Sequence, residues 1–242
     1  MGYIVRTRDS VFLDDIPITT YGLAAEMPQP IPIAVPRYTT WTSGESDFSE
    51  PDNSFDDVGY TFVVRCFKSP NNFLNPDFYA ACASAKKLTI SRHSGRHYRI
   101  RRLVSIKPTA VAHGNDIAYS VTFALAPFAY HNNNPAYTRD GTNTYLLNPG
   151  TRYSRPQYKV NHSLLGETTL SVNGETLIIS KDAANPIIID CEKMLAYSEA
   201  GHNETKYTRG LFPFLASGDN LLSAYSGSTY YQIIVQGNWR DY

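Results

Sequence analysis

The stretch that decides the fold class is Thr168-Thr169-Leu170-Ser171-Val172-Asn173-Gly174-Glu175-Thr176-Leu177-Ile178-Ile179. Large apolar residues occupy every second position on each side of Asn173-Gly174, at Leu170 and Val172 before it and at Leu177 and Ile179 after it. A period of two is typical of strands with one buried face, and Asn-Gly is typical of the joins between them. We therefore predict two antiparallel strands here.

The same pattern continues through the C-terminal half of the chain. Alternating apolar residues occur at Ile187 and Ile189 and again at Tyr231, Ile233 and Val235. Segments rich in Gly, Pro and Asn separate these stretches, at 148–151, 210–213 and 217–220. Short alternating strands with such breaks predict a β-sandwich. No catalytic residues stand out in it, so function must be sought in surfaces and assembly.

Length and composition favour two domains. The chain has 242 residues, and the Asn-rich passage 131–135 marks a boundary, so we predict domains at 1–131 and 132–242. The 18 Tyr and 11 Phe residues favour strands, and the Tyr rings suit either contact surfaces or the cores of two sandwiches. The 22 basic and 22 acidic residues cancel, so no bulk affinity for nucleic acid is expected.

Neither cofactor nor metal is expected. Cys66, Cys82 and Cys191 lack the spacing of a disulfide framework or a zinc site, and we expect buried free thiols in a reducing compartment. The common short catalytic motifs are absent, and His93 and His97 fall in an expected hairpin, where their spacing does not build a metal site. The N-terminus lacks a long apolar run, so neither a signal peptide nor a membrane anchor is expected. The protein is thus expected to be made in a cytoplasm and not to be an enzyme.

The first half predicts strands, one helix and a β-hairpin. The helix is expected from about Pro76 to Lys87, because Asn75 can cap it and Pro76 suits its first turn, with Lys86 and Lys87 in its last turn. The hairpin is expected to join strands at 88–90 and 98–106 across the polar tip 91–96. Further expectations are strands at 60–68 and 118–129, an opening hairpin or edge strands at 3–5 and 16–18, and a proline-rich edge or arm at 28–36.

Two segments of opposite charge stand out in this half. The acidic segment, 45–57, has six carboxylates and no Lys or Arg, and it predicts an exposed loop. The basic segment is the hairpin with its flanks, 86–102, which contains no carboxylate. The candidate contact residues are Arg92, Arg96, Arg99, Arg101 and Arg102 on the basic side and Asp52, Asp56 and Asp57 on the acidic side.

Three interpretations of these charges are open. The simplest is a solvated basic face that pairs with the acidic segment of the same subunit. In a ring, the acidic segment of one subunit would instead contact the basic hairpin of the next, which sets register more than affinity. Alternatively, the hairpin would line a channel for nucleic acid and make weak phosphate contacts. Of the two functional interpretations we favour the ring contact.

The order of short segments along the whole chain resembles the distal tail proteins of long-tailed bacteriophages with non-contractile tails. In the first half the resemblance rests on Tyr3-Ile4-Val5, Ile18-Thr19-Thr20-Tyr21-Gly22-Leu23, Tyr119-Ser120-Val121-Thr122-Phe123 and Pro127-Phe128-Ala129-Tyr130. In the second half it rests on Asn148-Pro149-Gly150-Thr151, Ser154-Arg155-Pro156, Val172-Asn173-Gly174, Ile189-Asp190-Cys191-Glu192, Phe212-Pro213-Phe214-Leu215, Ser217-Gly218-Asp219-Asn220 and Asn238-Trp239-Arg240. One departure is that members commonly place a Gly-Arg-x-Gly-like turn where this chain has Val35-Pro36-Arg37-Tyr38.

The resemblance implies a mainly β protein with a ring-forming N-terminal domain and a galectin-like C-terminal β-sandwich. The N-terminal domain would be a β-sandwich or split barrel with one α-helix and a β-hairpin. Six copies would form a homo-hexameric ring that joins the major tail tube protein to the tail-tip or baseplate hub protein, with receptor-binding proteins as further partners. The ring would leave a central channel in which DNA makes at most transient contact. The implied location is the tail tip of a virion assembled in the host bacterial cytoplasm.

Two other classes of function compete with this one. A carbohydrate-binding module is the alternative, because the C-terminal sandwich has rings that could contact a sugar, although such rings more often belong to a core or its rim. They are Trp239, Tyr197, Tyr207 and Tyr225. An enzyme of unrecognised type ranks last, because no nucleophile, base or metal constellation is visible in the sequence.

Overall fold

A computed structural model describes residues 10–26, 31–43, 46–66, 74–93, 95–109 and 118–241, without the side chains of residues 37–54 and 66. The chain divides into two compact units, Met1–Tyr130 (unit 1) and His131–Asp241 (unit 2). The architecture is mainly β, as the sequence predicts, with one α-helix in the described part. The roles assigned to the two halves of the chain stay predictions.

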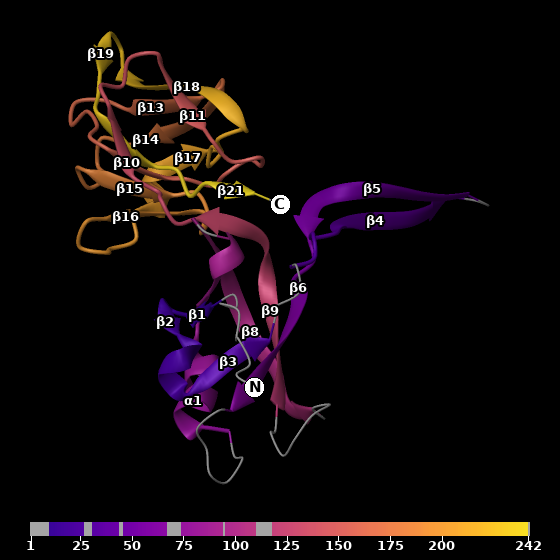
Figure 1. Ribbon diagram of the computed structural model, residues 1–242. Helices are drawn as coiled ribbons and strands as arrows, with labels where there is room; N and C mark the ends of the chain where they lie inside the picture. The colour runs from indigo at the N-terminus through magenta and orange to yellow at the C-terminus, as the bar shows by residue number, and fades with distance from the viewer. Residues whose placement is uncertain are drawn as a thin grey trace. The chain divides into compact units, whose positions relative to one another are not determined.

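Unit 2 is a sandwich of two antiparallel sheets (Figure 1). The first has the order β10-β20-β12-β15-β16, formed by Ala136–Arg139, Ile233–Gln236, Gln157–Val160, Ile187–Asp190 and Leu195–Ser198. The second has the order β11-β18-β13-β14-β17, formed by Thr144–Asn148, Gly218–Ser226, Thr168–Val172, Glu175–Ile179 and Thr208–Gly210. The shorter elements are the 3-10 helix η3 (Thr205–Tyr207) and the strands β19 (Thr229–Tyr230), which pairs with β18, and β21 (Arg240–Asp241).

The inward faces of these two sheets share one hydrophobic core. Leu170, Val172, Leu177 and Ile179 are buried in it, as their alternation predicts. The first sheet supplies the other alternating set, Ile187, Ile189, Ile233 and Val235, to the same cluster. Full burial of each such side chain contributes about 1.5–3 kcal/mol. The period-two prediction is therefore confirmed on both sheets.

The predicted join at Asn173-Gly174 is a tight hairpin turn. Val172 pairs with Glu175, and the two residues between them have φ of 51° and 89°. Left-handed backbone at both central positions is the geometry of a type I′ turn, which Asn-Gly adopts at little cost. The Asn173 side chain also donates to the Asn220 Oδ1 atom, at 2.7 Å, and accepts from the Leu221 N–H, at 2.8 Å. The turn is thus fixed to the neighbouring strand as well.

Two buried asparagine side chains hold the loops 148–154 and 215–220 together. The Asn220 Nδ2 group donates to the carbonyls of Ala216, at 2.9 Å, and Gly218, at 2.8 Å, and its Oδ1 atom accepts from the Ala216 N–H, at 2.7 Å. The Asn148 Nδ2 group donates to the carbonyls of Arg152, at 2.9 Å, and Ala216, at 3.0 Å. Both residues are almost fully buried, at 1% exposure or less. Only a neutral amide offers donors and an acceptor together in these places.

Unit 1 is built on one sheet with the order β2-β1-β7-β8-β9-β6-β3. In chain order its elements are β1 (Val11–Leu13), β2 (Ile16–Pro17), the 3-10 helix η1 (Ile18–Tyr21), β3 (Leu23–Glu26), β6 (Val58–Cys66), α1 (Pro76–Ser84), β7 (Lys87–Ile90), the 3-10 helix η2 (Ser91–His93), β8 (Arg96–Thr109) and β9 (Ala118–His131). The strands β6 and β9 and the hairpin of β7 and β8 confirm those predictions.

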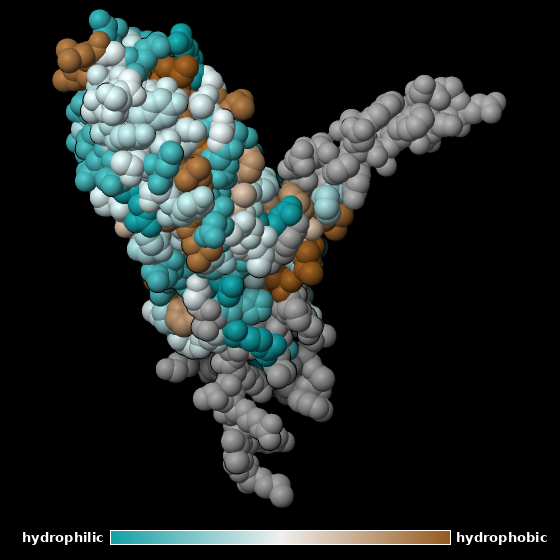
Figure 2. Space-filling view, turned by 90° about the horizontal axis from the view of Figure 1, so that it is seen from above, coloured by the Kyte–Doolittle hydropathy of each residue, from teal (hydrophilic) through white to brown (hydrophobic). Residues whose placement is uncertain are grey.

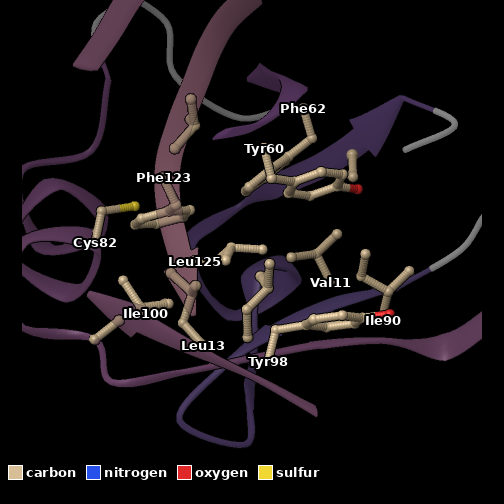
Figure 3. Close-up of a cluster of buried hydrophobic side chains, with 14 of the residues drawn as sticks. Val11, Leu13, Tyr60, Phe62, Cys82, Ile90, Tyr98, Ile100, Phe123 and Leu125 are labelled. Atoms are coloured by element: carbon tan, nitrogen blue, oxygen red, sulfur yellow. The ribbon is translucent and has the colours of Figure 1, made fainter. Parts of the chain in front are cut away.

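The sheet of unit 1 curls around its core. Strands β1 and β6 are separated by three strands in the sheet order, yet Val11 and Tyr60 belong to one buried cluster. Figure 3 shows side chains of β1, β6, β7, β8 and β9 gathered in this cluster, together with Cys82 of α1. A flat sheet could not bring these strands together, so the curvature encloses the core as in a partly open barrel.

The opening hairpin joins β1 to β2 across Asp14-Asp15, while residues 3–5 lie outside the described part. Both aspartates have left-handed backbone, with φ of 48° and 68°. The Asp14 carboxylate offsets the strain by accepting the N–H groups of Lys86, at 3.0 Å, and Lys87, at 2.8 Å. The turn therefore also fixes the start of β7.

Helix α1 begins as predicted but ends earlier. The Asn75 side chain accepts from the Asp77 N–H, at 2.8 Å, which confirms the cap. The predicted end at Lys87 is wrong, because Ala85 has extended backbone and Lys87 begins β7. The N–H groups after the helix pair with Asp14, a partner far away in the sequence that local helix signals do not reveal.

The acidic segment is not the loop that its composition predicts. Most of it forms β5 (Ser46–Phe55), which pairs with β4 (Pro36–Ser43) in a two-stranded hairpin, here called the arm. Acidic residues have low strand propensity, but the opposing strand supplies Thr39, Thr40 and Trp41, which favour strands. At the base of the arm Phe55 contacts Phe128 of β9 edge to face, with ring centroids 5.1 Å apart. The proline-rich segment 28–36 was expected to be an edge strand or an arm. Of its described residues only Pro36 belongs to β4, because 31–35 form no strand.

Replacing Asn220→Asp tests the buried amides. The carboxylate keeps the shape but loses both donors and places a charge among carbonyl oxygens, so the free energy of unfolding of unit 2 should fall by about 3 kcal/mol or more. Urea titration in a Trp41→Phe background, followed by the fluorescence of Trp239, measures this. The matched control, Asn161→Asp at an exposed site, should change stability by about 0.5 kcal/mol or less. Equal effects of the two changes would contradict the role assigned to Asn220.

Candidate functional site

The basic hairpin is formed by strands β7 and β8 of unit 1. Strands β7 and β8 pair Leu88 with Tyr98 and Lys87 with Arg99, which buries Leu88 and Tyr98 in the core. Ile90 and Ile100 follow the same alternation and are also buried, so the residues out of phase with these four face away from the core. Arg92, Arg96, Arg101 and Arg102 are exposed, whereas Arg99 is half-buried. The structure thus brings the predicted arginines together on one hairpin.

Arg99 is engaged within its own subunit. Its guanidinium lies 3.8 Å from the centre of the Tyr130 ring, a close cation–π contact. The His97 ring stacks on Tyr130 as well, with centroids 5.8 Å apart and planes at 24°. His97 and Arg99 lie on the same face of β8, so both contact the Tyr130 ring of β9. Arg99 therefore has a structural role that its place in the basic segment does not reveal.

An ion pair between Arg101 and Asp57 joins the acidic and basic segments within the subunit. Arg101 Nε lies 3.7 Å from an Asp57 carboxylate oxygen, and both side chains are about half exposed, at 59% and 49%. An exposed pair at this distance contributes about 0–1 kcal/mol. Asp56 is exposed beside it, and Asp52 lies on β5 without a described side chain. The interpretation of pairing within one subunit thus holds for Arg101 and Asp57, while a role in a ring stays a prediction for the others.

Unit 2 presents an exposed apolar strip that the sequence did not single out. On β11 and β18 the residues out of phase with the core point outward, and Tyr145 pairs with Leu221 there. The members are Tyr145 (67% exposed), Leu147 (59%), Leu221 (36%), Tyr225 (36%) and Tyr230 (48%). Figure 2 shows hydrophobic surface residues as small separate groups among hydrophilic ones on the face in view. Mixed surfaces with Tyr are typical of contacts between proteins.

A small pocket of about 390 Å³ lies beside β16 on the other sheet. Its lining residues are Lys193, Leu195, Ala196, Tyr197, Gly201 and Asn203. The signal in the sequence was Tyr197, named there as a possible ring for a sugar. Its neighbours come from two turns that flank the strand, so only the fold brings them together.

The other rings named for a sugar have different positions. Trp239 is 1% exposed and packs in the core, where it lies against Gly237, so of the two roles open to this ring it has the core role and offers no face to a sugar. A Trp ring of this size is a strong core residue, and composition alone could not separate the two roles. Tyr207 is half-buried and contacts the Lys206 ammonium, 4.7 Å from its ring centre, and Tyr225 belongs to the exposed strip.

The histidines of unit 2 do not build a catalytic group in the part of the chain that is described. His131 Nε2 lies 2.9 Å from Asp241 Oδ2, but no described serine or cysteine hydrogen-bonds to His131. His162 is buried, and its two ring nitrogens lie 2.9 Å from the carbonyls of Ser163 and Ala184. Among the described residues no group of three or more His, Cys, Asp or Glu side chains could hold a metal ion.

Two of the cysteines are buried free thiols, as expected, and Cys66 has no described side chain. Burial raises the pKa of the Cys82 thiol to about 12 and raises the pKa of Cys191 as well, so both stay protonated near neutral pH. No helix in the described ranges has the length and apolar character needed to cross a membrane.

Comparison with known proteins gives a match at the level of structure. No protein family model and no curated protein matches the chain. The crystal structure of the SPP1 Dit (gp 19.1) protein, described as a paradigm of the hub adsorption apparatus in Gram-positive infecting phages, is similar with a TM-score of 0.70. The likeness covers 95% of this chain and 98% of that one at 13% sequence identity. It shows that this chain has the fold of that protein.

Replacing Arg99→Ala tests the stacked cluster on Tyr130. Loss of the cation–π contact should lower the free energy of unfolding of unit 1 by about 1 kcal/mol. Replacing the exposed Arg102→Ala should change it by no more than about 0.5 kcal/mol. Native-state hydrogen exchange of the β8 and β9 amides measures the free energy of unfolding of unit 1 separately from that of unit 2. If both variants behave alike, Arg99 is a surface residue like the others.

Proposed function

We propose that this protein is a distal tail protein, a structural hub that joins the tail tube of a bacteriophage to the proteins of the tail tip. The observation that supports this best is the fold, which agrees with a phage hub protein over nearly the full length of both chains. Fold alone does not determine function. The segments that resemble the family in sequence add support, because Asn148 and Asn220, which lie within them, hold the loops of unit 2 in place.

The proposed assembly is a homo-hexameric ring formed by unit 1. The arm supports this, because β4 and β5 hydrogen-bond only to one another among the described strands. A two-stranded hairpin is marginally stable in water unless something packs against it. A neighbouring subunit in a ring would supply that surface. The acidic residues of β5 would then reach the next subunit, with Asp52 on the arm itself.

The basic hairpin is the proposed counterpart of the arm. The residues proposed to face a neighbour are Arg92, Arg96 and Arg102, because their side chains are exposed on this hairpin. Opposite charges on two faces of one subunit favour head-to-tail association and closure into a ring. A channel at the centre of the ring would pass DNA with transient contacts only. The alternative in which these arginines line that channel is separated from the ring contact by the second test below.

The proposed partners follow from this role. The major tail tube protein would bind one side of the ring and a tail-tip or baseplate protein the other, with receptor-binding proteins attached at the periphery. The apolar strip on β11 and β18 is a suitable surface for one of these proteins. The protein would then belong to the virion tail tip after assembly in the host cytoplasm.

The first test is the mass of the purified protein by light scattering across a concentration series, with negative-stain images of large species. Six-membered rings with an open centre are the expected result. A particle that stays monomeric at every concentration, also when mixed with tail tubes, would contradict the proposal.

The second test reverses the exposed arginines in the variant Arg92→Glu, Arg96→Glu, Arg102→Glu. Repulsion from the acidic arm should shift the ring toward smaller species, while the free energy of unfolding should change by no more than about 1 kcal/mol. The control variant Lys181→Glu, Lys206→Glu, Arg209→Glu makes the same charge change on exposed residues of unit 2 and should leave the ring intact. Intact rings in both variants would favour the channel-lining interpretation.

The third test removes the arm by replacing residues 37–54 with a short Gly-Ser linker. Because the core of unit 1 draws on the larger sheet, the melting temperature should change by only a few degrees, about what 1 kcal/mol produces in a domain of this size. Light scattering should then report monomers. Rings that persist without the arm would show that another surface closes them.

A further inference from the structure

The pocket beside β16 has walls that are fixed before any ligand arrives. The Tyr197 hydroxyl accepts a hydrogen bond from Gln157 Nε2, at 2.5 Å, which sets the orientation of the ring. Lys193 Nζ donates to Asp190 Oδ2, at 2.8 Å, and Asn203 Oδ1 accepts from the Thr205 N–H, at 2.9 Å. Holding three side chains by their neighbours lowers the ordering cost of binding. The site is therefore preorganised.

Three side chains at these walls have donors left over. The Tyr197 O–H, the remaining N–H groups of Lys193 and the Asn203 Nδ2 group point to a ligand rich in oxygen acceptors. The rest of the lining, chiefly the Tyr197 ring and Leu195, is apolar. Hydrogen bonds and the charge of Asp190 raise the pKa of Lys193, so this donor keeps its proton over the physiological range. The matching ligand has one apolar face and a rim of oxygen atoms.

A bound peptide strand fits this place poorly. β16 is the last strand of its sheet, but its outer edge is already paired with the following loop. The Ala196 carbonyl accepts from the Glu204 N–H, at 2.8 Å, and the Ser198 N–H donates to the His202 carbonyl, at 2.9 Å. A chain that adds to a sheet needs such groups free. A ligand in the pocket would therefore contact side chains, because the backbone groups at this edge of β16 are already hydrogen-bonded.

We propose that this pocket binds a saccharide, with the C–H face of a pyranose ring against Tyr197 and Leu195 and its hydroxyls accepting from Lys193 and Asn203. An aromatic ring beside a few fixed polar groups is the usual construction of a small-molecule site. The volume of about 390 Å³ falls within the range for such pockets and suits one or two sugar rings. The Lys193–Asp190 pair is internally neutralised, so the site takes neutral sugars and tolerates an acidic substituent. This proposal does not depend on ring assembly.

The test uses the full-length protein on an array of neutral and acidic mono- and oligosaccharides, followed by NMR titration of the strongest binders. Saturable binding with a dissociation constant of about 1 mM or tighter is expected for at least one probe. Replacing Tyr197→Ala should weaken it at least about tenfold through loss of the ring face. Replacing the exposed Leu195→Asp, which adds a carboxylate beside the donors, should have the same effect without loss of the fold.

The matched control is Leu147→Asp, an exposed leucine on β11, the edge strand of the other sheet, which should leave binding unchanged. Thermal unfolding of each variant shows whether it is folded, and Leu195→Asp decides the result if Tyr197→Ala is not. Absence of saturable binding to every saccharide on the array overturns the proposal. Binding that survives Leu195→Asp, or that Leu147→Asp removes, also overturns it, because the sugar then lies elsewhere.

Discussion

The loops of unit 2 depend on hydrogen bonds made inside the protein by two neutral amides. Asn148 and Asn220 bind loop carbonyls that would otherwise be buried without partners, and Asn173 joins the same network from the turn of β13 and β14. An unpaired buried carbonyl is costly, so the amides allow irregular backbone to pack against a hydrophobic core. The loops 148–154 and 215–220 can therefore pack against the sandwich without the energetic cost of unpaired buried carbonyls.

The elements that the sequence predicts well are those whose signals are local. Alternation with period two placed the buried residues of β13 and β14, and Asn75 with Pro76 placed the start of α1. The errors arose where a distant partner decides the outcome. The end of α1 depends on Asp14, and the acidic segment became a strand because β4 pairs with it.

The candidate sites follow the same rule. Composition predicts the arginines of the hairpin, but the contacts of Arg99 and Arg101 within the subunit depend on Tyr130 and Asp57, which lie far away in the chain. The chemistry of Trp239 suits a core as well as a binding surface, and only its packing shows that it lies in the core. In the pocket beside β16, Gln157 hydrogen-bonds to Tyr197 and Asn203 lines the same wall, and no spacing in the sequence predicts that these residues lie together.

The closed edge of β16 also affects the tendency of the protein to aggregate. Open strand edges recruit strands of other chains, which leads to aggregation when the protein is concentrated. Here the loop 202–205 occupies the outer edge with hydrogen bonds of its own, so two copies cannot extend their sheets into one another at this place. The same loop supplies Asn203 to the pocket beside β16, so the segment that protects this edge against strand addition also shapes a surface of side chains.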